Sequence, residues 1–414
     1  VTFIVARSAL TRSRRDHPLP AGEGAEYHPP SPFRPLLEIH VQRTPLYQFH
    51  LDRGAKMVDF AGWEMPVAYK RGVLAEHHQV RNSGGVFDVS HMGRVEVKGR
   101  HARRFLEKLC TRRISDMAQG QCRYSLVCNE RGGVRDDIIV SRFEEDEFLL
   151  VVNASNRVKL LSHFTEVKGD MAVSIEDKTM KTAMVALQGP KVMEMISGVS
   201  REIPTLKKYR FTVKNLMVMK LIVSRTGYTG EDGVEVILPA MAIGMAMKLL
   251  LKDVDLDDPN AVLQPAGLAA RDTLRLEAGM PLYGHELSED WDALSSQLNF
   301  AIALDKGQNN GEETFVGQDA LLKIRDAGGP KRLLVGLELE GKRSARQGMK
   351  VMRNGAEIGE VTSACLSPTL GKAIALAYLD AAQSEAGTAI QVDTGKGSVF
   401  EGHVVPTPFY KAKK

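Results

Sequence analysis

Apolar and polar residues follow two different periods along this chain. Apolar residues spaced three or four apart, as on one face of a helix, occur in four segments: Leu74–Arg81, His101–Leu109, Met241–Leu251 and Ala266–Ala278. Short runs rich in β-branched and aromatic residues predict strands at Asp137–Ser141, Glu147–Asn153, Met184–Leu187, Leu221–Ser224 and Gly233–Leu238. Because helices and strands alternate irregularly, the pattern predicts an α+β fold rather than a βαβ repeat.

The pattern changes after about Asp326, where helical spacing nearly stops. Ala327–Pro330 is a cluster of helix breakers, and short strand-like runs follow it up to Val405. Between two of these runs, Asn354-Gly355 predicts a type I′ hairpin turn, because both residue types accept a positive φ. Residues 331–414 are therefore predicted to form a compact all-β barrel or sandwich.

The first 42 residues differ from the rest of the chain. Val1–Pro35 is dense in proline and lacks apolar periodicity, so we expect it to remain an unfolded leader or tail. Its opening stretch, VTFIVARSALTRSRR, is basic and free of acidic residues, which is typical of a mitochondrial transit peptide. Three interpretations stay open: a transit peptide, a disordered tail, or an upstream stretch translated from a misassigned start.

Composition and charge exclude several classes of protein. With 43% hydrophobic and 26% charged residues, the composition of this 414-residue chain is ordinary for a soluble globular protein. A net charge of +4 is too small to indicate nucleic acid or an anionic membrane as the main partner. No apolar run approaches the ~20 residues of a spanning helix. The four cysteines lack C-x-x-C spacing, which argues against a disulfide scaffold or a structural zinc site and favours a reducing compartment.

Adjacent carboxylates at Asp136 and Asp137 follow a glycine turn at the start of a predicted strand. Successive strand residues face opposite sides, so one of the two aspartates can face a given pocket and the other should point elsewhere. Taken alone, the pair fits two solvated carboxylates or one aspartate that faces a polar ligand.

Three other features offer candidate chemistry, each with an ordinary structural alternative. The loop Ser224–Gly233 has closely spaced glycines that permit close backbone approach, but it lacks the pattern of a phosphate loop. Arg271 and Arg275 share one helix face and could bind a carboxylate bidentately or form a solvated stripe. The Ser90-His91 pair lacks a third group and is weak evidence for acyl transfer. The histidines show no metal-ligand spacing, so we expect no metal.

Taken together, these segments resemble the glycine cleavage system T protein, or aminomethyltransferase, family from about Arg43 to Tyr410. The resemblance rests on several motifs that occur in the family's order: RTPLYQFHLDRGAKMVDFAGWEMPVAY (43–69), FDVSHMG (87–93), CNERGGVRDDIIV (128–140), VVNASN (151–156), ALQGP (186–190), SRTGYTGEDGVEV (224–236), PAGLAARDTLRLEAGMPLYGHEL (265–287) and SPTLGKAIALAYL (367–379). Residues 288–314 match only loosely.

The resemblance implies a fold, a reaction and two partners. The implied fold has three domains around a central channel: a folate-binding catalytic region of two interleaved α+β domains, residues 43–326, and a C-terminal β-barrel, residues 331–414. The implied reaction takes an aminomethyl group from the lipoyl arm of H protein. It releases ammonia and passes the one-carbon unit to tetrahydrofolate, which becomes 5,10-methylenetetrahydrofolate. Tetrahydrofolate is the acceptor substrate, and the family uses no metal.

The resemblance also implies roles for individual residues. Asp137 matches the carboxylate that faces the pterin ring and raises the nucleophilicity of the folate nitrogen. The remaining matches are expected to line the folate site: Met92, Tyr124, Asn153, Tyr209, Tyr228, Glu235, Arg271 and, in a C-terminal segment that reaches back to the site, Tyr410.

Two alternatives to this reaction remain open. One is a related folate-dependent demethylase that acts on a small methylated donor without a lipoyl partner. The other is a non-catalytic folate-binding relative that takes part in tRNA maturation. The presence of Asp137, Tyr228, Glu235 and Arg271 together favours the transferase. The body of the chain is of bacterial type and predicts a cytoplasmic protein, whereas a genuine transit peptide would place it in the mitochondrial matrix.

Overall fold

The computed structural model describes residues 41–216, 219–251, 254–255, 258, 260–308, 312–395 and 397–412. The predictions for the leader concern residues 1–42 and lie outside the described residues, except at Val41 and Gln42. Within the described residues, no helix is both long and apolar enough to cross a membrane.

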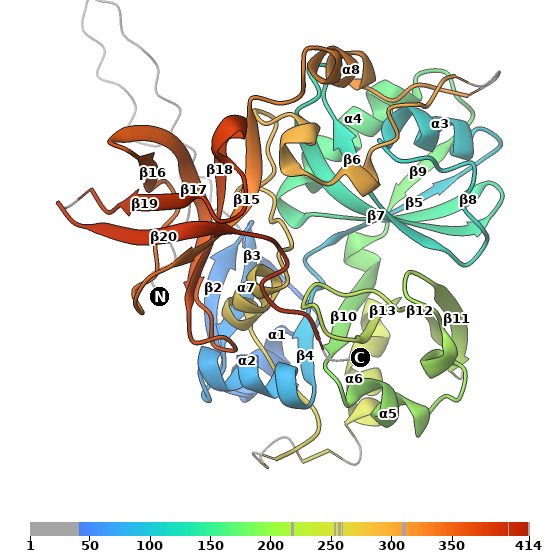
Figure 1. The fold of residues 1–414 in the computed structure, drawn as a ribbon. Helices are drawn as coiled ribbons and strands as arrows, with labels where there is room; N and C mark the ends of the chain where they lie inside the picture. The colour runs from blue at the N-terminus through green and yellow to red at the C-terminus, as the bar shows by residue number, and fades with distance from the viewer. Residues whose placement is uncertain are drawn as a thin grey trace, which may run out of the picture.

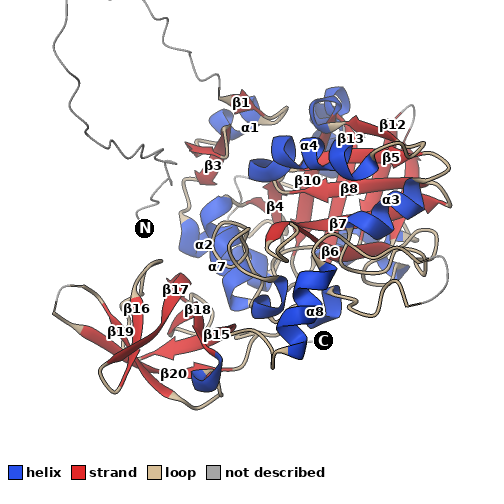
Figure 2. Cartoon of the chain, turned by 90° about the horizontal axis from the view of Figure 1, so that it is seen from above, coloured by secondary structure: helices blue, strands red, loops and turns tan. Residues whose placement is uncertain are grey.

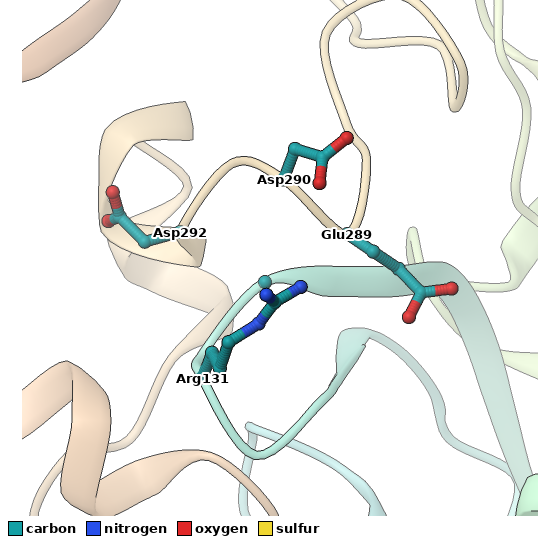
Figure 3. A pocket seen from close by; sticks show the side chains of 5 residues that line it. Arg131, Glu289, Asp290 and Asp292 are labelled. Carbon is teal, nitrogen blue, oxygen red and sulfur yellow. The ribbon is translucent and has the colours of Figure 1, made fainter. Parts of the chain in front are cut away.

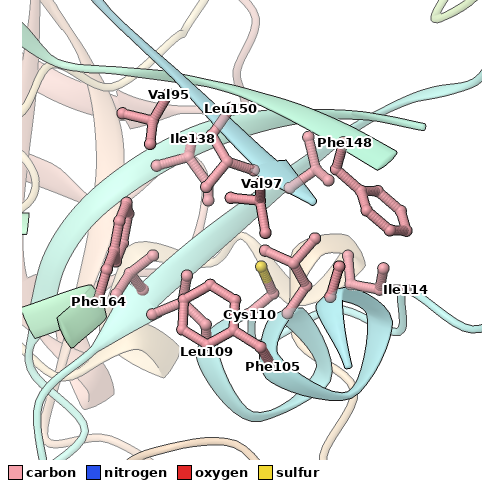
Figure 4. Close-up of a cluster of buried hydrophobic side chains, with 14 of the residues drawn as sticks. Val95, Val97, Phe105, Leu109, Cys110, Ile114, Ile138, Phe148, Leu150 and Phe164 are labelled. Atoms are coloured by element: carbon pink, nitrogen blue, oxygen red, sulfur yellow. The ribbon is translucent and has the colours of Figure 1, made fainter. Parts of the chain in front are cut away.

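A five-stranded sheet in the order β6-β7-β8-β5-β9 forms one layer of the molecule (Figure 1). Its strands are β5 (Gly93–Lys98), β6 (Cys122–Cys128), β7 (Val134–Glu144), β8 (Glu147–Val152) and β9 (Ser174–Asp177). The helices α3 (Ala102–Leu109) and α4 (Arg157–Lys168) belong to the same part of the chain. Phe105 of α3 and Phe164 of α4 pack edge to face, with ring centroids 6.1 Å apart, beneath Ile138 and Leu150 of the sheet (Figure 4). This apolar cluster fixes the sheet that bears Asp137.

A six-stranded sheet in the order β11-β12-β13-β10-β4-β14 forms a second layer. Its strands are β4 (Gly85–Asp88), β10 (Thr182–Gln188), β11 (Phe211–Leu216), β12 (Met219–Ser224), β13 (Gly233–Pro239) and β14 (Gln264–Pro265), and α5 (Val192–Ser197) and α6 (Ile243–Leu250) accompany it. The neighbours β4 and β10 are separated in sequence by the entire five-stranded sheet. The two sheets are therefore interleaved along the chain.

A small three-stranded sheet and two helices form the first part of the described chain. They comprise β1 (Gln42–Arg43), β2 (Lys56–Phe60), β3 (Trp63–Ala68), α1 (Tyr47–Asp52) and α2 (Val73–Asn82). Helix α7 (Leu268–Glu277) packs against α2 (Figure 2) and β3, and also against two strands of the C-terminal part, β17 (Ala356–Leu366) and β18 (Ala373–Asp380). Through these contacts α7 connects α2 and the small sheet to the barrel.

The C-terminal strands close into a barrel in the order β15-β18-β17-β16-β19-β20. They are β15 (Arg332–Leu339), β16 (Lys350–Arg353), β17 (Ala356–Leu366), β18 (Ala373–Asp380), β19 (Ala389–Asp393) and β20 (Val399–Val405), and α8 (Gln318–Asp326) precedes them. Asn354 and Gly355 between β16 and β17 have φ values of 52° and 79°, as the predicted type I′ turn requires. Because the six strands close on themselves, the prediction of a barrel is confirmed and that of a sandwich is excluded.

The α+β class is confirmed, while two predicted helices begin later than expected. α6 begins at Ile243 because residues 240–242 form a 3₁₀ turn rather than α-helix. α7 begins at Leu268 because the preceding Gly267 is extended and Pro265 belongs to the short strand β14. The division of the chain into domains at residues 43–326 and 331–414 stays a prediction.

Candidate functional site

Asp137 projects from β7 between two hydrogen-bond donors on neighbouring strands. The hydroxyl of Tyr124, on β6, donates to one carboxylate oxygen of Asp137 at 3.1 Å. The amide nitrogen of Asn153, just after the end of β8, donates to the other at 2.8 Å. These donors hold the carboxylate in one orientation, and Asp137 itself is only partly buried.

Asp136 is fully buried on the other face of β7, as strand alternation predicts. A shared hydrogen-bond donor nevertheless links its carboxyl group to that of Asp137. The Asn153 side chain sits at the strand end and donates to both carboxylates, at 2.8 Å in each case. Asp136 also accepts hydrogen bonds from the Asn153 backbone at 3.0 Å and from Asn156 at 2.6 Å. Asp136 thus lies on the opposite face of the strand from Asp137, as expected. Asn153 nevertheless joins the two carboxyl groups in one hydrogen-bond network.

Burial dominates the electrostatics of this carboxyl pair. Loss of solvent raises the pKa of both groups above the ordinary value, and the nearby Asp137 charge raises the pKa of Asp136 further. Burial, together with the Asp137 charge, also raises the pKa of the Tyr124 hydroxyl, which stays protonated and can donate. The pair therefore favours one negative charge over two near neutral pH.

Tyr228 and Arg271 form a second group of candidate residues. The Arg271 guanidinium lies over the Tyr228 ring, 4.7 Å from its centroid. The Tyr228 hydroxyl donates to the carbonyl of Pro281 at 2.5 Å, which fixes the ring. Burial raises the pKa of Tyr228, and the Asp137 charge contributes to this rise, so the two groups lie within electrostatic range of each other.

The loop before β13 brings Tyr228 to this position because its glycines allow close packing. A Cβ at Gly227 would lie 1.9 Å from the side-chain oxygen of the buried Gln188, so a larger residue would push the loop away. Glu235 follows on β13 and accepts a hydrogen bond from Thr226 at 2.5 Å. The charge of Glu235 also partly offsets the lowering of the Arg271 pKa by burial.

Arg271 and Arg275 share a helix face, but the structure gives them different roles. Arg275 is 1% exposed and bonds to Glu286 at 2.8 Å and to Ser363 of the barrel at 2.7 Å. Arg271, in contrast, has a buried Nη1 with no hydrogen-bond partner among the described residues. A buried unpaired N–H group is costly, so Arg271 is suited to bind an anionic ligand.

Two other predicted residues lie at the margin of this group. Tyr209 is 48% exposed and has a left-handed φ of 59°. The charges of Arg112 and Glu235 both affect its pKa, which burial raises. Met92 is partly buried against the apolar cluster that contains Phe87 and Val89.

Tyr410 lies elsewhere, over Arg81 rather than over Arg271. The ring centroid is 4.0 Å from the Arg81 guanidinium, and the Tyr410 backbone donates to the carbonyl of Glu277 at 2.8 Å. The predicted return of the C-terminal segment from the barrel is visible in Figure 1, where the chain after β20 passes α7.

The structure also shows one aromatic neighbour that sequence reasoning missed, Phe300, and gives a different environment to His91, which the sequence analysis considered only for acyl transfer. Phe300, 61% exposed, packs against the Tyr124 ring with centroids 5.9 Å apart. His91 is buried beside Met92, and burial lowers its pKa to about 3, so its ring is neutral. The FDVSHMG motif was a signal for His91. Phe300 lies in the loosely matching segment 288–314, where no motif marks it.

A surface cavity of about 270 Å³ near the start of β7 does not include any of the predicted residues (Figure 3). Arg131, Gly133, Glu289, Asp290 and Asp292 line it. Its carboxylates point in different directions and two already have structural partners: Glu289 pairs with Lys159 at 2.9 Å, and Asp292 accepts hydrogen bonds from Ser295. Across the described residues, no cluster of three or more His, Cys, Asp or Glu side chains could hold a metal ion, and the absence of a metal from the reaction stays a prediction.

The chemistry available at this site is that of hydrogen-bond acceptance at one end and anion binding at the other. Asp137 can accept N–H groups of a planar heterocycle, and Tyr124 and Asn153 keep it oriented. Arg271 can pair with a carboxylate, and the Tyr228 ring beside it provides an aromatic surface. This arrangement fits an elongated molecule that is polar and aromatic at one end and anionic at the other.

Comparisons with known proteins point to the same family for both parts of the chain. Residues 46–306 match the family model described as the GCVT N-terminal domain, and residues 332–411 match the glycine cleavage T-protein C-terminal barrel domain. The aminomethyltransferase of Rubrobacter xylanophilus is 46% identical over 376 residues, which cover 90% of this chain and 95% of that protein. The aminomethyltransferase of Symbiobacterium thermophilum is 42% identical over 379 residues, covering 90% of this chain and 98% of that protein.

A solved structure extends the similarity to three dimensions. The crystal structure of glycine cleavage system aminomethyltransferase T from Bartonella henselae superposes with a TM-score of 0.81 at 31% identity, covering 90% of this chain and 99% of that chain. Both parts of the chain, the interleaved sheets and the closed barrel, therefore have counterparts in one known architecture. The chain belongs to the glycine cleavage T-protein family of aminomethyltransferases.

Proposed function

We propose that this protein is a folate-dependent aminomethyltransferase that acts on the aminomethyl-lipoyl arm of an H protein. The observation that carries the proposal is a set of two groups that meet at Tyr228. The Arg271 guanidinium, whose buried Nη1 has no hydrogen-bond partner among the described residues, lies over the Tyr228 ring, and the charge of the oriented Asp137 carboxylate acts on the Tyr228 hydroxyl. Tetrahydrofolate has N–H groups on its pterin ring and carboxylates on its glutamate tail. The two ends of the site match these two ends of the substrate.

The reaction breaks two bonds to the transferred carbon and forms two others. The carbon leaves the lipoyl sulfur and the amine nitrogen, and it bonds to two nitrogens of tetrahydrofolate to give 5,10-methylenetetrahydrofolate. The two hydrogens lost from the folate nitrogens balance the ammonia and the lipoyl thiol. The Asp137 carboxylate would accept a hydrogen bond from an N–H group of the folate and so raise the electron density on the attacking nitrogen.

The remaining residues of the site would orient the substrate. Asn153 and Tyr124 hold the Asp137 carboxylate in one orientation, in which it would meet the N–H groups of the pterin ring. Tyr209, Glu235 and Met92 would line the folate site, as the family resemblance implies. The similarity of the bacterial relatives supports placing the protein in the cytoplasm, and the lipoylated H protein would be its macromolecular partner.

The decisive test is ammonia release from aminomethylated lipoyl H protein, with and without tetrahydrofolate. We expect release that depends on tetrahydrofolate and yields methylenetetrahydrofolate in equal amount. Folate binding without ammonia release would instead indicate the demethylase or the non-catalytic relative. Demethylation of a small methylated amine in the presence of tetrahydrofolate would separate these two.

A further inference from the structure

A buried ionic network connects the segments that carry Tyr228 and Arg271, and Arg81 of α2 lies at its centre. The Arg81 side chain is 3% exposed. Its Nε and Nη2 donate to the same carboxylate oxygen of Glu277, at 3.0 and 2.8 Å. Its Nη1 donates to the carboxylate of Glu231 and to the carbonyl of Thr229, at 2.8 Å in each case. One guanidinium therefore joins α2, the glycine loop and α7.

Two partners of Arg81 lie on the segments that carry the predicted folate residues Tyr228 and Arg271. Thr229 directly follows Tyr228 in the loop. Arg81 also donates to the carbonyl of Leu274 at 3.2 Å, on the helix that bears Arg271. Arg81 therefore holds together the glycine loop and α7, the same two segments that meet where the Tyr228 ring contacts Arg271.

The C-terminal segment completes the network. Tyr410 covers the open face of the Arg81 guanidinium at 4.0 Å, and its backbone bonds to Glu277. Glu277 is itself fully buried and accepts hydrogen bonds from Ser367 at 2.5 Å and from Thr369 at 3.0 and 2.8 Å in the barrel. Arg81 is thus connected to the barrel both through Glu277 and through Tyr410.

We propose that Arg81 is a positioning residue for folate binding and that Tyr410 supports it from the C-terminal segment. Arg81 sets the distance between the Tyr228 loop and the Arg271 helix without contacting substrate. A lysine at this position would keep the positive charge but could not span Glu231, Glu277 and two backbone carbonyls, because its donors come from one atom. The inference rests on the proposed function, since the family resemblance assigns Tyr228 and Arg271 to the folate.

The test combines a folate-binding measurement with one that needs no folate. Arg81→Lys and Tyr410→Ala are compared with the wild type by calorimetric titration with tetrahydrofolate in anaerobic buffer. Hydrogen exchange of the amides in residues 226–233 is measured on the same folate-free proteins. Arg104→Lys, at an exposed ion pair with Glu313, and Tyr47→Ala, at the Arg43–Tyr47 cation–π pair, are the matched controls.

We expect Arg81→Lys and Tyr410→Ala to weaken tetrahydrofolate binding by about tenfold or more, since small displacements of positioned groups have effects of up to ~100-fold. Exchange in residues 226–233 should be faster in both variants, while the two controls match the wild type. Wild-type binding and loop exchange retained in both variants would overturn the positioning role. If the wild type fails to bind tetrahydrofolate, the proposed function is wrong, and the loop exchange still decides whether Arg81 holds the loop. If Arg81→Lys does not fold, Tyr410→Ala decides the outcome alone.

Discussion

The substitution Asp137→Asn separates the chemical role of this carboxylate from its structural role. Asparagine has nearly the same shape as aspartate, and its carbonyl oxygen can still accept the 2.8 Å hydrogen bond from Asn153. Tyr124, which donates to Asp137 at 3.1 Å, can turn its hydroxyl to accept from the new amide. Both contacts therefore survive, while the negative charge is lost.

The expected loss of activity is large. A positioned acid or base contributes typically ~10²–10⁴-fold to the rate, so folate-dependent ammonia release should fall by about this factor. Affinity for the H protein should not change, because Asp137 is expected to act on the pterin. The assay is turnover of aminomethylated H protein, with Asp290→Asn as the control at an exposed aspartate that is not part of the site.

The stability of the same variant should move in the opposite direction. Burial raises the pKa of Asp137 in the folded state above its value in the unfolded state. The Asp137 charge therefore opposes folding at pH values above the folded-state pKa, and this destabilisation disappears once the pH falls below the unfolded-state pKa. Asp137→Asn should therefore be at least as stable as the wild type in thermal or urea unfolding near pH 8, because the substitution removes a charge that burial disfavours. The gain should vanish near pH 4. Unchanged turnover, or lost turnover with a clearly lower melting temperature, would refute this reasoning.

Three further variants probe other parts of the argument. Arg271→Gln should raise the KM for tetrahydrofolate by about 10–100-fold with a smaller change in kcat, because a charge-assisted bond is worth ~1.5–3 kcal/mol; an unchanged KM in steady-state assays would contradict this. Phe105→Ala removes a fully buried ring and should lower the free energy of unfolding in urea by about 3–5 kcal/mol, whereas a loss below ~1 kcal/mol would argue against the packing described. Burial acts to raise the pKa of the Glu277 carboxyl, but hydrogen bonds from His77, Ser367 and Thr369 lower it to about 2. The stabilisation by this carboxylate is therefore present above about pH 4 and is lost as the pH falls toward 2. The melting temperature of Glu277→Gln should therefore fall less than that of the wild type between pH 7 and pH 3. An equal fall in both proteins would exclude a contribution of ionised Glu277 to stability.

Local signals in the sequence predicted most of the elements around the site. The Asn354-Gly355 turn has positive φ values that few residue types accept, so the hairpin followed from two residues alone. The alternation of Asp136 and Asp137 likewise followed from the period of a strand. What the period could not show is that Asn153, beyond the end of another strand, reaches both carboxylates.

Contacts between distant segments were the part that local patterns missed. Arg271 and Arg275 have the same spacing and residue type, and only the partners from the barrel and from Glu286 distinguish them. Arg81 lies in a helix with an ordinary pattern, and its acceptors come from segments about 150 to 200 residues further along the chain. Such ion networks leave no periodic trace, because each partner is set by the tertiary fold.

The interleaving of the two sheets has a consequence for the order in which the protein folds. All five strands of the sheet that holds Asp137 lie between Gly93 and Asp177, so this sheet can form from one continuous piece of chain. The six-stranded sheet requires β4 and β10 to meet across that piece, and its edge strand β14 arrives only at Gln264. Once the five-stranded sheet has formed, the flexible loop between β4 and β10 is already shortened, which lowers the entropic cost of joining them. The buried Arg94, which donates to the carbonyls of Ser90 and Thr182 at the two crossings between sheets, would then lock the second sheet onto the first.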